Sequence, residues 1–133
     1  MRILTLHIFA YAVVLVGCSV NVPSKQDVLE TKPILDEVYE GDYQAAAACT
    51  LDRIQTADYK FASGTVQYVP VPTLGYVEIQ TTGDAGGLFG QIYPQITRFE
   101  DIDGSEFRVI VRAGIMEFGI AAVDAVRKCV EVK

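Results

Sequence analysis

The sequence predicts a small α+β domain of two layers, in which an antiparallel sheet of about four strands is covered by an amino-terminal and a carboxy-terminal helix. Three observations lead to this fold class. Apolar and polar residues alternate with a period of two from Tyr59 to Ala113, whereas the segments before and after have a helical period. Each of these two helical segments carries one cysteine, Cys49 or Cys129, so one disulfide could staple them together. A length of 133 residues allows a single such domain.

The first residues of the chain have the pattern of a secretory signal. Met1 and Arg2 precede an apolar run from Ile3 to Val16, which is shorter than the roughly 20 residues of a membrane-spanning helix. The run ends in Leu15-Val16-Gly17-Cys18, an aliphatic pair, a small residue and a cysteine. This end resembles the lipobox of bacterial lipoproteins.

The resemblance implies how the chain is processed and where it is held. In that class the cysteine receives a diacylglycerol, a peptidase removes residues 1–17, and the new amino group of Cys18 is acylated. More than one acyl chain would anchor the protein stably to a membrane. Ser19 stands where the inner-membrane retention signal of the class has aspartate, which favours the outer membrane, facing the periplasm. The alternative is an ordinary cleaved signal with an unmodified cysteine.

The two remaining cysteines favour a disulfide. Cys49 and Cys129 are far apart in the sequence, so they form neither a CxxC redox pair nor a clustered metal site. Export would bring them into an oxidising compartment, where such a pair forms one bridge. Closing so long a loop would contribute about 4 kcal/mol. The alternative is two buried free thiols.

The amino-terminal half of the exported chain predicts a tether and a helix. Residues 18–33 are polar and bracketed by prolines, which is typical of a flexible tether spanning on the order of 20 Å. A single globular domain then fills residues 34–133. Ile34–Tyr39 is expected as a short helical turn, and Asp42 as the cap of a clearer, alanine-rich helix over Tyr43–Ile54.

The middle of the chain predicts strands and their turns. Pro70 and Pro72 exclude Val69–Pro72 from a central strand, and Pro94 likewise suggests an edge position for its strand. Asp103-Gly104 is typical of a hairpin turn. The predicted strand segments are Tyr59–Phe61, Val66–Tyr68, Gly75–Thr81, Gln91–Phe99 and Phe107–Val111.

After Gly114 the helical period returns. One stripe holds Ile115, Gly119, Val123 and Val126, and Asp124 and Lys128 on the opposite side are spaced for an ion pair. The competing interpretation continues a hairpin over Ile115–Ile120, because Met116, Phe118 and Ile120 also alternate. The helix is favoured.

Composition argues against several classes of function. The net charge is -6 and no Lys/Arg cluster exists, which excludes nucleic acid as a primary partner. The single histidine, His7, lies in the predicted leader, so the mature chain lacks the histidine of Ser-His-Asp triads and zinc hydrolases. Residues 83–90 lack the spacing and lysine of a phosphate loop, and residues 99–107 depart from a calcium loop. We expect no enzyme activity, no cofactor and no metal.

These observations lead to two functional hypotheses. The leading one is a lipid-anchored, non-enzymatic interaction or assembly module of the cell envelope with an envelope protein as its partner; the alternative is a carrier of a lipid or other small apolar ligand between sheet and helices. Two places are candidate partner contacts. One is the glycine-flanked pair Leu88 and Phe89, and the other is Arg108, Ile110 and Arg112, provided that helices leave that sheet face uncovered.

Overall fold

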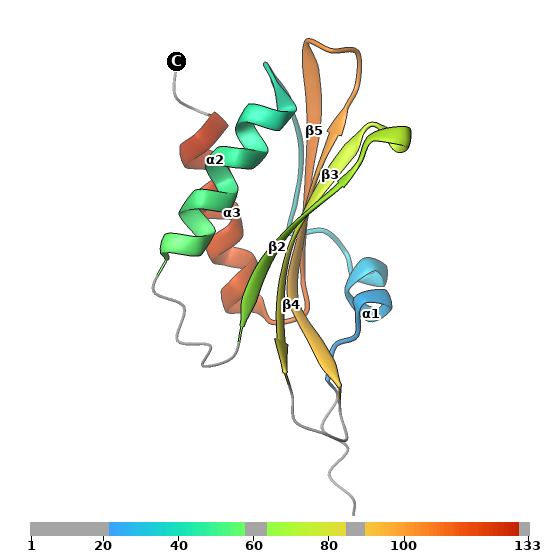
Figure 1. The fold of residues 1–133 in the computed structure, drawn as a ribbon, viewed down its shortest axis with the longest axis vertical. Helices are drawn as coiled ribbons and strands as arrows, with labels where there is room; N and C mark the ends of the chain where they lie inside the picture. Colours follow the sequence, from blue (N-terminus) through green and yellow to red (C-terminus); the bar gives the residue numbers. More distant parts are fainter. Residues whose placement is uncertain (1–21, 58–63, 85–89, 131–133) are drawn as a thin grey trace, which may run out of the picture.

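A computed structural model of the chain describes residues 22–57, 64–84 and 90–130. These residues form the expected α+β domain, with five strands in its sheet (Figure 1). The predicted leader, Cys18, the strand segment Tyr59–Phe61 and the pair Leu88 and Phe89 lie outside the described residues. The elements in chain order are α1 (Lys25–Glu30), β1 (Leu35–Glu40), α2 (Tyr43–Thr56), β2 (Thr65–Val71), a 3-10 turn η1 (Pro72–Leu74), β3 (Tyr76–Asp84), β4 (Gln91–Asp101), β5 (Glu106–Ala113) and α3 (Met116–Val130).

The five strands form one antiparallel sheet in the order β1-β5-β4-β3-β2. Helices α2 and α3 cover one face, and the short helix α1 packs against β4 and β5 on the other (Figure 1). We call these the helix face and the outer face. The prediction of a helical turn over Ile34–Tyr39 is wrong, because this segment is the edge strand β1. Only Leu35 of β1 is buried, so the burial pattern that would identify a strand is nearly absent from its sequence.

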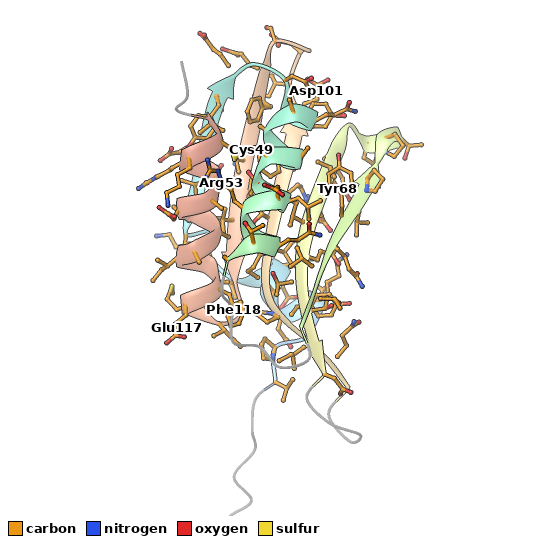
Figure 2. All side chains as sticks on the ribbon, turned by 60° about the vertical axis from the view of Figure 1, so that its left-hand side comes forward. Cys49, Arg53, Tyr68, Asp101, Glu117 and Phe118 are labelled. Carbon is orange, nitrogen blue, oxygen red and sulfur yellow. A yellow bond between two sulfur atoms is a disulfide. The ribbon has the colours of Figure 1, made fainter. Side chains whose placement is uncertain are left out.

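The hydrophobic core lies between the helix face and the two long helices. Its largest fully buried side chains include Phe99 and Phe107, which pack against small residues of the helices such as Ala47 and Ala122. The predicted disulfide is confirmed. Cys49 and Cys129 are bonded with their Cα atoms 5.8 Å apart, which joins α2 to α3 (Figure 2).

Both long helices begin and end close to their predicted limits. The Asp42 carboxylate accepts hydrogen bonds from the backbone N–H groups of Gln44 and Ala45, as a helix cap does. Residues 116–120 belong to α3, so the helical interpretation is confirmed over the hairpin. The predicted pair of Asp124 and Lys128 is present, with 2.6 Å between Oδ2 and Nζ.

The two proline-containing strands differ in position. β2, which contains Pro70, is an edge strand as predicted, but β4, which contains Pro94, is the central strand. A bulge explains how the central strand accepts a proline. Thr81 pairs with Gln95 and Gly83 with Ile92, so two residues of β4 stand opposite one residue of β3. The missing N–H of Pro94 therefore falls at an interruption of the ladder.

The segment predicted as a flexible tether, residues 18–33, is in large part folded onto the domain. Lys25–Glu30 is helical, and Val28 is completely buried. Ser24 and Asp27 cap this helix reciprocally, because each side chain accepts a hydrogen bond from the other's backbone N–H. The domain therefore begins before residue 34.

Gly114 shows how closely this amino-terminal segment approaches the sheet. A Cβ atom at this position would stand 2.8 Å from Val28 Cγ2 and 2.9 Å from Pro23 Cβ, and it would collide with the Tyr93 carbonyl oxygen. The absence of a side chain is thus a condition for the docking of α1. No helix within the described ranges is long and apolar enough to cross a bilayer.

Candidate interaction surface

The register of the sheet aligns one residue from each strand across the outer face. Val38 pairs with Arg108, Arg108 with Glu100, Glu100 with Tyr76, and Tyr76 with Val71. Because neighbouring strands are 4.7–4.9 Å apart, roughly 20 Å separates the two ends of this line. We call it the open row, and its members are Val38, Arg108, Glu100, Tyr76 and Val71.

Helix α1 covers the part of the outer face next to the open row. Val28 is buried there, and Leu29 lines a small pocket together with Ile96 and Ile110 of the sheet. The Arg112 guanidinium donates a hydrogen bond to the Thr31 carbonyl, just after the helix. This part of the outer face is therefore occupied by the chain itself.

The predicted contact residues of β5 consequently have different surroundings. Ile110 is only 9% exposed, and Arg112 is half-buried beside the end of α1. Arg108 is exposed and belongs to the open row. The structure therefore leaves Arg108 as the one member of this predicted trio that is open to a partner.

Next to the open row, Glu78 is the centre of a buried charge cluster. Its side chain is 3% exposed, and it contacts Arg98 at 2.6 Å and Lys25 of α1 at 3.3 Å. The Gln80 amide donates a further hydrogen bond of 2.7 Å. Burial opposes the ionisation of Glu78, but the hydrogen bonds from Arg98 and Gln80 and the positive charges of Lys25 and Arg98 outweigh it, so its pKa lies below the ordinary value. The cluster thus ties α1 to the sheet.

Arg98 connects this cluster with the open row. Its guanidinium lies over the ring of Tyr76, 4.3 Å from the centroid, and contacts Glu100 at 3.4 Å. A cation over an aromatic face is attracted to it and fixes the ring in place. Two members of the open row, Tyr76 and Glu100, are held by the same arginine.

A second ion pair fixes Arg108 at the other side of the row. Its Nε and one terminal nitrogen reach the two Asp36 oxygens at 2.6 and 2.7 Å, a bidentate arrangement that restricts both side chains. The hydrogen bond from Arg108 lowers the pKa of Asp36. The open row thus presents an arginine and a tyrosine in defined orientations, and these two residue types are enriched in protein interfaces.

The open row combines exposed apolar groups with paired charges. Val38 is 55% exposed on the edge strand, and Glu100, Tyr76 and Val71 are half-buried. An apolar group lies at each end of the row, with opposite charges between them. The described residues contain no cluster of histidine, cysteine or carboxylate side chains that could hold a metal ion.

Two pockets bear on the alternative of a ligand carrier. One, of about 180 Å³, lies between α1 and the outer face and is lined by Leu29, Ile96, Arg98, Ile110 and Arg112. Another, of about 100 Å³, lies on the opposite side of the sheet, where Ile54 and Phe118 are among its lining residues. Sites for small molecules usually have about 300–1,000 Å³. These two pockets are therefore below that range, as is one of about 230 Å³ beside Phe107 and Val130 on the helix face. A pocket of about 380 Å³ falls within the range, but polar residues such as Thr65, Thr82 and Gln91 line it, which does not suit an apolar ligand.

The predicted hairpin turn at Asp103-Gly104 is confirmed between β4 and β5. Its carboxylates accept hydrogen bonds from the backbone of the turn. The Asp103 carboxylate accepts hydrogen bonds from the backbone N–H groups of Ser105 and Glu106, at 2.9 and 3.0 Å. The bond from Ser105 contributes most to lowering the pKa of Asp103. Asp101 accepts in the same way from the Gly104 N–H, at 2.8 Å. These acids shape the hairpin tip.

Sequence reasoning did not find the open row or the Glu78 cluster. Both depend on which residues of distant strands stand side by side, and the periodicity of a single strand does not contain the register. The docking of α1 did have a signal, the Ser24 and Asp27 spacing of a capping box. No family model, curated protein or solved structure matches the chain, so the interpretation of the surface depends on its own residues.

Proposed function

We propose that this protein is a lipid-anchored cell-envelope protein that faces the periplasm and acts as a non-enzymatic interaction or assembly module. The observation that carries the proposal is the open row. This line of side chains crosses all five strands, and α1 packs beside it without covering it. A surface of exposed apolar groups and oriented charges binds another protein by complementarity. Nothing in such a surface requires a catalytic group.

Two further features support the location in the envelope. Leu15-Val16-Gly17-Cys18 has the pattern of a lipobox, with Cys18 as the lipidated residue. The Cys49–Cys129 disulfide suits an oxidising compartment, in which such bonds form and persist. Ser19 after the cysteine favours the outer membrane.

The chemistry of the open row indicates what kind of partner it would bind. A partner would place a carboxylate near Arg108, a basic group near Glu100, and apolar side chains on Val38 and Tyr76. Arg108 and Glu100 are already paired within the domain, with Asp36 and Arg98. A partner therefore gains little binding energy from their charges, but it must match their fixed positions, which favours specificity over affinity.

The test is purification of the lipidated protein from native membranes in mild detergent, with proteins and lipids identified together by mass spectrometry. The Arg108→Glu variant reverses the positive charge of the row, and Arg53→Glu makes the same change on the exposed surface of α2 (Figure 2). We expect a stoichiometric protein partner with the wild type and Arg53→Glu, and its loss with Arg108→Glu. Equal recovery with both variants would contradict the assignment of the surface. Enriched lipid without a protein would support the carrier instead.

A further inference from the structure

The docking of α1 shortens the link between the domain and its anchor, and this inference rests on the proposed lipidation of Cys18. Four contacts hold residues 23–31 on the domain: the buried Val28, the ion pair of Lys25 and Glu78, and the backbone contacts of Pro23 and Thr31. Only the residues between Cys18 and Pro23 therefore separate the proposed anchor from this docked segment. Fully extended, five residues at 3.3–3.6 Å each reach about 17 Å.

This link joins the domain at one defined end. The Pro23 carbonyl accepts a hydrogen bond of 3.0 Å from the Tyr93 N–H, and Gly114 lies against Pro23. Tyr93 stands near the start of β4, and Met116 begins α3 two residues after Gly114. We call this the entry end of the domain.

The opposite end of the molecule lies far from the anchor. Figure 2 shows Asp101, where β4 ends, at one end of the domain, and Glu117 and Phe118 of α3 toward the other. The 11 residues of β4 span roughly 35 Å at the usual rise of a strand. The hairpin tip is therefore about twice as far from the entry end as the link can stretch.

We propose that the entry end rests against the bilayer surface and that the hairpin tip points away from it. The bilayer is the occupant that the chain length selects, because acyl chains on Cys18 must enter it within about 17 Å of Pro23. Met116 is 57% exposed at this end and offers an apolar contact with the headgroup region.

Acidic side chains are more numerous at the hairpin end than at the entry end. The Gly41 N–H bonds to the Ser105 carbonyl, which brings the end of β1 beside the tip. The acids of this end are Glu40, Asp42, Asp101, Asp103 and Glu106, whereas Asp84 and Glu117 lie at the entry end. The larger negative charge at the tip is repelled more strongly by anionic headgroups, which favours its position away from the membrane.

The chain contains no tryptophan, so a single introduced one reports its own surroundings. The full lipidated protein is placed in vesicles of phosphatidylcholine and phosphatidylethanolamine that contain a headgroup-nitroxide lipid as quencher. Met116→Trp is the probe at the entry end, and Ile102→Trp is the matched probe at the tip, since both native side chains are exposed. We expect Met116→Trp to lose more than half of its emission and Ile102→Trp almost none.

A second pair of variants tests the role of α1. Val28→Asp would place a charge in a fully buried position and release α1, which restores a link of some fifteen residues with a span on the order of 20 Å. Combined with Met116→Trp it should lose most of the quenching, whereas the exposed control Gln26→Asp should keep it. Near-ultraviolet circular dichroism checks that the domain of each variant stays folded.

The outcomes separate this inference from the proposed function. Flotation of the vesicles in a density gradient and mass spectrometry of Cys18 test the anchor itself. If the protein does not float with the vesicles, or Cys18 carries no lipid, the proposed anchor fails, and the proposed orientation of the entry end on the bilayer fails with it. If the protein floats but the two probes are quenched equally, the anchor stands and the proposed orientation is overturned. Quenching that survives Val28→Asp in a folded domain would overturn the role of α1.

Discussion

The two faces of the sheet are covered in different ways. On the helix face two long helices, joined by a disulfide, bury Phe99, Phe107 and their aliphatic neighbours. On the outer face a helix of six residues, begun by a capping box, covers part of the sheet and is held there by one buried valine and a charge cluster. A helix of this length is not stable in isolation, and its structure therefore depends on its packing against the sheet. The comparison teaches that the helix face holds most of the hydrophobic core, whereas the outer face is only partly covered and leaves the open row uncovered.

The largest expected effect lies on the helix face. Replacing both Cys49 and Cys129 with alanine should lower the free energy of unfolding by about 4 kcal/mol, because the bridge closes a long loop and limits the unfolded chain. Urea denaturation of the wild type and the double variant measures the difference. Hydrogen exchange of α1 in the native state should stay unchanged, and faster exchange there would show that the two faces are coupled.

A smaller loss is expected from the outer face. Val28→Ala removes two buried methyl groups, which should weaken the docking of α1 by about 2 kcal/mol. Exposed amides of α1 should then exchange faster, while those of β4 and β5 keep their protection. The exposed control Gln26→Ala should change neither. Loss of protection throughout the sheet would mean that α1 supports the fold as much as α2 and α3 do.

The difference between the two faces also explains what could be predicted from the sequence. On the helix face, apolar periodicity, the Asp42 cap and the two cysteines were sufficient for α2, α3 and their disulfide. On the outer face, one buried residue in six was too little to reveal either α1 or β1 by periodicity. The prediction of an edge position for the strand with Pro94 was wrong, because the bulge that accommodates this proline depends on pairing with β3.

The charge cluster should make the stability of the fold depend on pH. The pKa of Glu78 is lower in the folded protein than the roughly 4.3 of an unfolded chain, so its contribution is complete above that value and is lost as the pH falls through the folded pKa. Glu78→Gln should lower the free energy of unfolding by about 1–2 kcal/mol at neutral pH and remove this part of the acid dependence. Urea denaturation between pH 7 and pH 3 measures both effects, and an equal acid dependence in the variant would exclude Glu78 as its source.

The smallest effect on stability is expected in the open row itself. Asp36→Asn breaks the exposed pair with Arg108, which should change the free energy of unfolding very little because water screens the pair. Recovery of the partner should nevertheless fall, because Arg108 loses the contact that orients it. Urea denaturation and co-purification are compared in the same variant. A large loss of stability without a change in partner recovery would assign the pair to folding.

The position of the disulfide also determines what a protease could release. A single cut anywhere between Cys49 and Cys129 leaves the two pieces covalently joined, and both stay attached to whatever holds the amino terminus. A cut before Cys49, by contrast, lies outside the closed loop, and one between Thr31 and Ile34 would break the covalent connection between α1 and the rest of the domain. Proteolytic release from an anchor at the amino terminus would therefore require a cut in the segment before Cys49.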